Sequence, residues 1–214
     1  MSAMPSTIVS ELSQRAALLD VILIPAAAAQ LLQLLDELEL WNRAYNLTSV
    51  VTRAAMVTHH LLDSLAASPD LTGTRIADLG TGAGFPGLPL AVVHPDKQFT
   101  LIDATAKKIR FVSHAARTLG LKNVQALHGR AESLRSTLPF DTIVARAVGT
   151  LGELAVLARP LSRAGTRLLA YKGQRPDAEI SGLPSDWQLL SVRSVQIPGL
   201  NAQRCLVTLM AQAE

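Results

Sequence analysis

The chain has 214 residues, of which 49% are hydrophobic and 17% are charged. This composition excludes a disordered chain and predicts one ordered core with room for a small extension. The single cysteine, Cys205, cannot form a disulfide within the chain, so we expect a reducing, cytoplasmic setting and no structural zinc. The apolar run at 16–29 is interrupted by Asp20 and Pro25 and is too short to span a bilayer, so we expect no membrane contact.

Charge is distributed unevenly along the chain. Residues 1–100 carry 5 Lys/Arg against 9 Asp/Glu, whereas residues 101–214 carry 15 against 8. A basic half beside an acidic half is typical of proteins that bind a polyanion, with RNA or DNA as the first candidates. An ordinary solvated surface with a slight excess of arginine is the alternative, and charge alone does not decide between the two.

The first 70 residues are predicted to be helical and to form an extension packed on the domain built by residues 71–214. Leucines after Pro25 recur at helical spacing, and Thr52 is placed to cap a further helix that runs to about Ala67. His59, His60 and Asp63 lie on that helix. We interpret them as a hydrogen-bonded His–Asp pair on the surface, because no second cluster of metal ligands is visible, and a role near a substrate is the alternative.

Strands and helices alternate from Arg75 onward. The pattern predicts helices near 86–93, 104–119, 149–159 and 175–182, and strands at 75–79, 98–103, 124–128, 140–146, 165–172, 188–197 and 204–211. Apolar strands joined by helices indicate a doubly wound, mostly parallel sheet, with a ligand at the carboxyl ends of its strands. The last two strands follow each other directly, so we expect the final strand to be antiparallel.

The loop after the first strand contains the sequence Asp78-Leu79-Gly80-Thr81-Gly82-Ala83-Gly84-Phe85-Pro86-Gly87. Glycines allow the backbone to turn tightly and to lie directly against a ligand, and the following helix offers unpaired N–H groups. The embedded Gly82-x-Gly84-x-x-Gly87 matches a dinucleotide fingerprint, which is weak alone. An acid at Asp78 would repel a pyrophosphate but suits a cationic sulfonium, so we favour S-adenosylmethionine as the ligand.

Four later residues, at the ends of three strands, are predicted to complete the donor site. Asp103 ends the second strand, nineteen residues after Gly84, where a carboxylate can accept bonds from ribose hydroxyls; a helix cap is the alternative. Ala131 and Glu132 follow the third strand and could meet the adenine edge, with an acid in the first turn of a helix as the alternative for Glu132. Arg146 ends the fourth strand and is the residue we place nearest the chemistry, with an ordinary strand-end salt bridge as the alternative.

The chemistry of the acceptor is indicated by what the fourth strand lacks. It does not end in the Asp/Asn-Pro-Pro-aromatic tetrapeptide that is usual for methylation of an exocyclic amine. Methylation at a pyrimidine carbon needs a cysteine nucleophile, and Cys205 lies in the last strand, away from the mouth of the site. An acceptor that already carries a lone pair, such as guanine N7, needs neither device, and transfer then depends on positioning and electrostatics.

With these motifs assembled, the chain resembles the RsmG (GidB) family, the 16S ribosomal RNA guanine-N7 methyltransferases. The resemblance runs from about Leu38 to Lys172, and the motifs that carry it are Trp41-Asn42-Arg43-x-Tyr45-Asn46-Leu47-Thr48, His60-x-x-Asp63-Ser64, the loop at 78–87, and Ala145-Arg146-Ala147. Ala83 and Phe85 replace a common Pro and Leu of the family loop, and Ala145 stands where Ser is frequent.

The resemblance implies a Rossmann-like class I fold and transfer of a methyl group from S-adenosylmethionine to N7 of guanine 527 in 16S rRNA. It implies donor contacts at Gly80, Phe85, Ala131, Glu132 and Arg146, beside Asp78, Gly82, Gly84 and Asp103 from the residues themselves. We expect a monomer that acts on 16S rRNA or the small ribosomal subunit, without a metal. Lys107, Lys108, Arg110, Arg117 and Lys172 are candidate contacts to RNA phosphates.

Three alternatives remain open at the level of sequence. One is a nicotinamide-dependent oxidoreductase, because the dinucleotide fingerprint is embedded in the loop. Another is a non-catalytic RNA-binding protein that retains a methyltransferase fold. A third is a small-molecule methyltransferase, because a fold does not fix the substrate.

Overall fold

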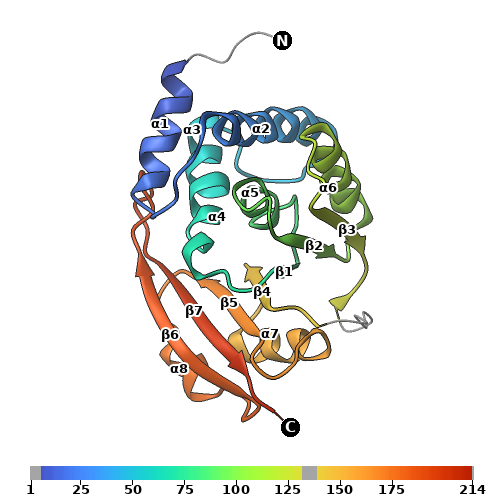
Figure 1. Cartoon of the computed structure of the whole chain (residues 1–214), viewed down its shortest axis with the longest axis vertical. Helices are drawn as coiled ribbons and strands as arrows, with labels where there is room; N and C mark the ends of the chain where they lie inside the picture. Colours follow the sequence, from blue (N-terminus) through green and yellow to red (C-terminus); the bar gives the residue numbers. More distant parts are fainter. Residues whose placement is uncertain (1–5, 132–138, 214) are drawn as a thin grey trace.

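A seven-stranded sheet runs through the middle of the molecule (Figure 1), in the order β3-β2-β1-β4-β5-β7-β6. The computed structural model describes residues 6–131 and 139–213. The strands are β1 (Arg75–Leu79), β2 (Gln98–Asp103), β3 (Val124–His128), β4 (Thr142–Arg146), β5 (Arg167–Lys172), β6 (Trp187–Val195) and β7 (Arg204–Ala211). All seven were predicted from the sequence, with bounds that differ from the observed ones by two residues at most.

The pairing of the strands is parallel from β3 to β5 and antiparallel on both sides of β7. This confirms the predicted doubly wound sheet with an antiparallel last strand. In the register of the sheet, Leu79 of β1 pairs with Ile102 of β2 on one side and with Ala145 of β4 on the other. Asp103 and Arg146 therefore lie one residue further, on either side of the point where the chain leaves β1.

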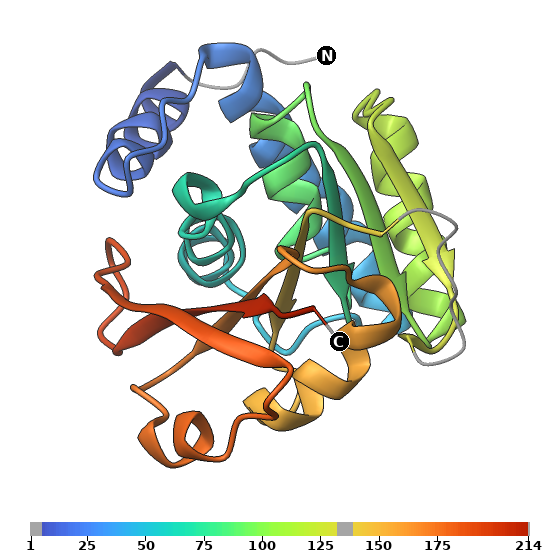
Figure 2. The same cartoon turned by 60° about the horizontal axis from the view of Figure 1, so that its bottom comes forward.

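Alternation along the strands divides the core between the two faces of the sheet, because successive side chains point to opposite faces. Ile76 and Val144 pack with the N-terminal helices, α5 (Gly87–Val93) and α6 (Ala106–Thr118). Ala77 and Ile143 pack on the other face, against α7 (Leu151–Ala158). Helices cover the sheet on both sides (Figure 2). The short α8 (Asp177–Ser181) and the 3₁₀ turn η4 (Arg159–Leu161) complete this second half.

The N-terminal extension consists of α1 (Ser6–Ala17), α2 (Pro25–Tyr45) and a helix that runs from Arg53 to Leu65, followed by the 3₁₀ turn η2 (Ser68–Asp70). α1 reaches the tip of the β6–β7 hairpin (Figure 1), where Arg15 Nη2 donates to the Pro198 carbonyl at 2.8 Å. Thr52 caps the third helix as predicted, accepting the amide of Ala55 at 3.3 Å. One cluster of buried side chains joins α1 and α2 to the face of the sheet.

The third helix contains a stretch that the sequence did not predict. It begins as α3 (Arg53–Met56), widens into the π-helix η1 (Val57–Leu62) and ends as α4 (Asp63–Leu65). A π-helix bonds each amide to the carbonyl five residues back instead of four, and such turns are common at functional sites. The π segment holds both His59 and His60, so it places them differently from a regular α-helix.

Candidate functional site

The loop between β1 and α5 carries three glycines in the left-handed region, with φ of 68° at Gly80, 61° at Gly82 and 88° at Gly84. A residue with a Cβ is strained in this region, which explains the spacing of the glycines. A Cβ on Gly80 would lie 2.5 Å from Val148 Cγ2, whereas a Cβ on Gly82 would meet nothing nearer than 4.0 Å. The backbone at Gly82 therefore has open space beside it, as a ligand cradle requires.

Asp78 lies beneath this loop and is fully buried. Its Oδ2 accepts the Thr81 hydroxyl at 2.6 Å and the Gly87 amide at 2.8 Å, so one carboxylate oxygen ties the two ends of the loop together. The other oxygen, Oδ1, has no hydrogen-bond partner among the described residues. The structure thus gives Asp78 a loop-fastening role that the sequence did not predict, and its contact with a bound cation remains a prediction.

Asp103 closes the other side of the loop. Its Oδ2 accepts the Gly82 amide at 2.9 Å and its Oδ1 accepts the Thr105 amide at 2.8 Å, just ahead of α6. A helix cap was the alternative to a ribose role, but the N-cap of α6 is Thr105, and the contact of Asp103 is a turn bond to the amide of that residue. It leaves further lone pairs on both oxygens, so a ribose contact at Asp103 remains a prediction.

A cavity of about 290 Å³ opens beside Asp103. Of the predicted donor residues, it brings together Gly80, Asp103 and Ala131, while Glu132 lies outside the described residues. Its other walls are Leu79, Ile102, Ala104, Gly129, Arg130, Val148 and Leu157. Mostly apolar walls with a single carboxylate suit a flat, uncharged ring and its attached sugar.

A second cavity, of about 420 Å³, lies on the other side of the β4 end. It is lined by His59, His60, Asp63, Arg146, Ala147, Tyr171, Lys172, Gly173 and Arg204. The two cavities share one short piece of chain as a wall, because Ala147 lines this one and the next residue, Val148, lines the first. Ala147 has a φ of 57°, an uncommon conformation for a residue with a side chain, and such strain clusters at functional sites.

Arg146 is held firmly on the wall of the second cavity. Its Nη1 donates to the His59 carbonyl at 2.8 Å and to Asp63 Oδ2 at 2.9 Å. Its guanidinium carbon lies 5.9 Å from the centroid of the Phe85 ring, within the range of a cation–π contact. The predicted alternative, a salt bridge, is therefore real, but it is buried and joins the arginine to the N-terminal extension.

The interpretation of His60 and Asp63 as a surface pair is wrong. Both are buried, with exposed fractions of 8% and 5%, and each bonds to other partners. His60 Nε2 lies 3.0 Å from Thr48 Oγ1, and its ring stacks on Phe85 with centroids 4.6 Å apart. Burial, followed by the nearby Arg146 charge, lowers the pKa of His60 to about 4, so its ring is neutral at physiological pH.

The polar and aromatic cluster at residues 41–48, which begins in the last turn of α2, supports this arrangement indirectly. Asn42 brackets Thr48, its Nδ2 donating to the Thr48 carbonyl at 3.0 Å and its Oδ1 accepting the Thr48 amide at 2.8 Å. Thr48 then contacts His60, which stacks on Phe85 of the glycine loop. Gly84, the neighbour of Phe85, packs tightly, since a Cβ there would lie 2.3 Å from Leu88 Cδ1. The cluster thus braces the loop through His60.

The candidate RNA-binding lysines are engaged in contacts within the chain. Lys107 Nζ donates to the Tyr45 carbonyl at 2.9 Å, and Lys108 Nζ lies 3.8 Å from Asp103 Oδ2. Lys172 lines the second cavity and bonds the Gly149 carbonyl and Glu179. Arg110 and Arg117 are exposed on α6. Contact with RNA phosphates by any of these residues remains a prediction.

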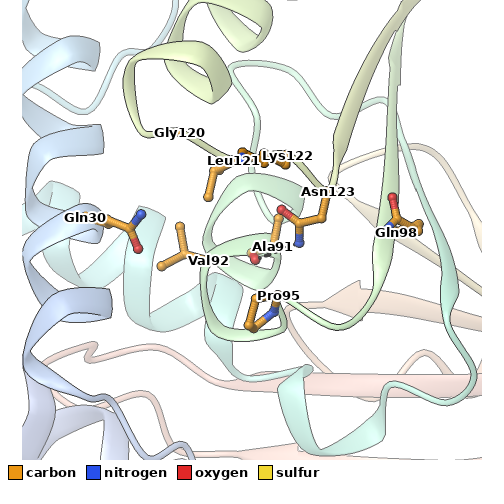
Figure 3. A pocket seen from close by; sticks show the side chains of 9 residues that line it. All are labelled: Gln30, Ala91, Val92, Pro95, Gln98, Gly120, Leu121, Lys122 and Asn123. Carbon is orange, nitrogen blue, oxygen red and sulfur yellow. Dashed lines mark hydrogen bonds between the residues drawn. The ribbon is translucent and has the colours of Figure 1, made fainter.

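A third hollow, of about 300 Å³, lies at the opposite end of the sheet, near the start of β2 (Figure 3). Two of its polar side chains, Asn123 and Gln30, bond to the backbone. Asn123 Nδ2 donates to the carbonyls of Ala91, His94 and Lys97, and Gln30 Nε2 donates to that of Leu119. This hollow is therefore a structural junction between α2, α5 and α6, far from the loop of glycines.

Residues 6–131 and 139–213 contain neither a cluster of metal ligands nor a helix able to span a membrane. No group of three or more His, Cys, Asp or Glu side chains in these ranges is arranged to hold a metal ion. No helix in the same ranges combines the length and the apolar character needed to cross a bilayer.

Comparisons with known proteins bear on both the fold and the family. Residues 27–207 match the family model for rRNA small subunit methyltransferase G (GidB). Ribosomal RNA small subunit methyltransferase G of Pseudomonas syringae pv. syringae is 42% identical over 203 residues, which cover 95% of each chain. Its counterpart in Xanthomonas oryzae pv. oryzae is 46% identical over 182 residues, covering 85% of this chain and 86% of that one.

Among solved structures, the O-methyltransferase TomG from Streptomyces achromogenes, in complex with SAM, matches with a TM-score of 0.56. The two chains are 18% identical, and the match covers 85% of this chain and 90% of TomG. At this level of identity the likeness shows the fold alone, which agrees with the predicted Rossmann-like class I architecture.

Proposed function

Because the chain belongs to the rRNA small subunit methyltransferase G family, we propose that it transfers a methyl group from S-adenosylmethionine to N7 of guanine 527 in 16S rRNA. It is an S-adenosylmethionine-dependent rRNA methyltransferase, and the atom and the nucleotide are the proposed part. The observation that supports the proposal best is the pair of cavities lined by the neighbouring residues Ala147 and Val148. One cavity is mostly apolar with one carboxylate, and the other is basic.

The residues present fit the donor. S-adenosylmethionine supplies a methyl group on a positively charged sulfur, together with an adenosine and an amino-acid end. We infer that Asp103 accepts from the ribose, that Gly80 and Ala131 flank the nucleoside, and that the open space beside Gly82 receives the donor against the backbone. Glu132 stays a prediction for the adenine edge.

The second cavity suits a guanine that is methylated at N7. Guanine N7 has a lone pair and no proton to lose, so the transfer needs no general base. Two of the titratable side chains that line the cavity are already engaged within the protein, since His60 is held by Thr48 and Asp63 is shared between Arg146 and Arg204. Arg146 stands at the boundary of the cavities and is placed to hold either the donor carboxylate or guanine O6 and its phosphate.

The proposal is tested by mass mapping of 16S rRNA from cells with and without the protein. We expect one methyl group on the fragment that contains guanine 527 in the presence of the protein, and its loss in the absence of the protein. Labelled methyl transfer in vitro then excludes a non-catalytic RNA-binding role. A methyl group that persists at this nucleotide without the protein would contradict the proposal.

The pH dependence of donor binding tests Asp78. Burial raises the pKa of this carboxyl to about 6, against the opposing effect of hydrogen bonds from Thr81 and Gly87. A raised pKa means that the group is protonated below about pH 6, whereas a cationic ligand favours the ionised form. We therefore expect the affinity for S-adenosylmethionine, measured by calorimetry, to fall by up to about tenfold per pH unit below pH 6.

Asp78→Asn should remove this pH dependence and bind more weakly at pH 8. The sulfonium of S-adenosylmethionine carries its charge at every pH, so the positive sulfur that Asp78 is expected to face does not change. Equal affinities of the wild-type protein at pH 5 and pH 8 would show that the charge of Asp78 does not reach the donor.

A further inference from the structure

Asp63 bonds two arginines from different strands of the sheet. Its Oδ2 accepts from Arg146 Nη1 at 2.9 Å, and its Oδ1 accepts from Arg204 Nε at 3.0 Å. Arg146 ends β4 and Arg204 begins β7, whereas Asp63 itself belongs to the N-terminal extension. All three side chains line the second cavity. A single buried carboxylate therefore fixes how far apart these two guanidinium groups lie.

The π-helix adds a second hold on the same arginine. The amide of Asp63 donates to the Thr58 carbonyl, five residues back, whereas in a regular α-helix it would donate to the His59 carbonyl. The His59 carbonyl accepts from Arg146 Nη1 at 2.8 Å instead. Both contacts use the same nitrogen, so Nε and Nη2 of Arg146 have no hydrogen-bond partner in the part of the chain that the structure describes.

We propose that Asp63 is a positioning residue for methyl transfer, which holds Arg146 through one nitrogen and leaves its other N–H groups to the reacting molecules. Arginine is a long and flexible side chain, and a group that acts on a transition state must be fixed before the reaction. Without the carboxylate, the guanidinium groups of Arg146 and Arg204 would repel each other across the cavity. This inference rests on the methyltransferase function proposed above.

The chain contains a matched control for the proposal. Arg193 Nη2 on β6 also donates to a helix carbonyl, that of Ala66 at 2.7 Å, and to a carboxylate, that of Asp70. The chemistry is the same, and each bridge joins a strand arginine to the N-terminal extension, with Arg193 and Asp70 more exposed than Arg146 and Asp63. Neither Asp70 nor Arg193 is among the described residues that line the two cavities. Loss of Asp70 therefore reports the structural cost of such a bridge alone.

The test compares single-turnover rates of labelled methyl transfer to 16S rRNA, at a temperature well below every melting midpoint. Asp63→Asn should be at least about 30-fold slower than wild type, whereas Asp70→Asn should stay within about threefold. In a double-mutant cycle, Asp63→Asn combined with Arg146→Gln should be as slow as Arg146→Gln alone, within about threefold, because the carboxylate acts through the arginine. A structural defect alone would not produce this lack of additivity.

Two results overturn the positioning role: a rate for Asp63→Asn within threefold of wild type, or losses that multiply in the double variant. Should Asp63→Asn not fold, Asp63→Glu replaces it, because it keeps the charge but moves it by one methylene. It is combined with Arg146→Gln in the same double-mutant cycle, and the same limits on the rates apply. The wild-type protein reports on the proposed function separately. No transfer by wild type refutes that function, whereas equal transfer by wild type and Asp63→Asn refutes the positioning role alone.

Discussion

Arg146→Gln should lower the rate of methyl transfer to 16S rRNA by about 100- to 1,000-fold, the loss typical when one fixed donor to a transition state is removed. Glutamine keeps much of the length of the side chain but removes the charge. The structure also predicts a cost in stability, because Asp63 is buried and loses one of its two cationic partners. We expect about 1–3 kcal/mol, or a fall in the melting midpoint of about 2–12 °C.

Binding measurements on the same variant separate the two roles left open for Arg146. Calorimetry with S-adenosylhomocysteine should show an affinity that falls in step with the rate if the guanidinium holds the donor carboxylate. An affinity within threefold of wild type would assign the guanidinium to the guanine or its phosphate. Arg193→Gln is the control, since it breaks a similar bridge outside the cavities. A rate for Arg146→Gln near that of wild type would remove Arg146 from the mechanism.

The sheet and the edge that carries the donor site could be predicted from the sequence because both follow from local patterns. Strands such as β1 and β4 are short apolar runs, and the carboxyl ends of parallel strands meet at one edge. Asp103 and Arg146 therefore came to the same edge as predicted, one residue beyond the partners of Leu79. Thr52 was also predicted as a cap, since its contact with Ala55 spans only three residues.

The second cavity could not be predicted in the same way, because its contacts join residues far apart in the chain. Arg204 stands in the last strand without a local motif and meets Asp63 across 141 positions. The spacing of His60 and Asp63 indicated a shared helix face, but the π segment and the burial against β4 gave each a different partner. The bonds of Asp78 to Thr81 and Gly87 could not be predicted either, because they depend on its burial beneath the loop.

Two substitutions in the glycine loop should also have large effects, one mainly on stability and the other mainly on donor affinity. A Cβ on Gly87 would lie 2.7 Å from Asp78 Oδ2 and 2.7 Å from Leu101 Cγ, both inside the core. Gly87→Ala should therefore force the loop off its anchor and cost about 2–4 kcal/mol from overpacking and the weakened Asp78 bond. For a chain of this size we expect the melting midpoint to fall by about 4–16 °C.

Gly82→Ala should instead lower donor affinity more than stability. Its Cβ meets no atom nearer than 4.0 Å, so the protein alone tolerates it apart from the strain of a φ of 61°. That strain costs about 1–2 kcal/mol, and the same amount applies to Gly120→Ala, where φ is 70° and the space is open but no donor residue is near. The two variants should therefore melt at similar temperatures, while Gly82→Ala alone binds S-adenosylhomocysteine at least about tenfold more weakly than wild type. Equal affinities in the two variants would mean that the donor does not lie against the backbone at Gly82, and the cradle would have to be sought elsewhere along the edge of the sheet.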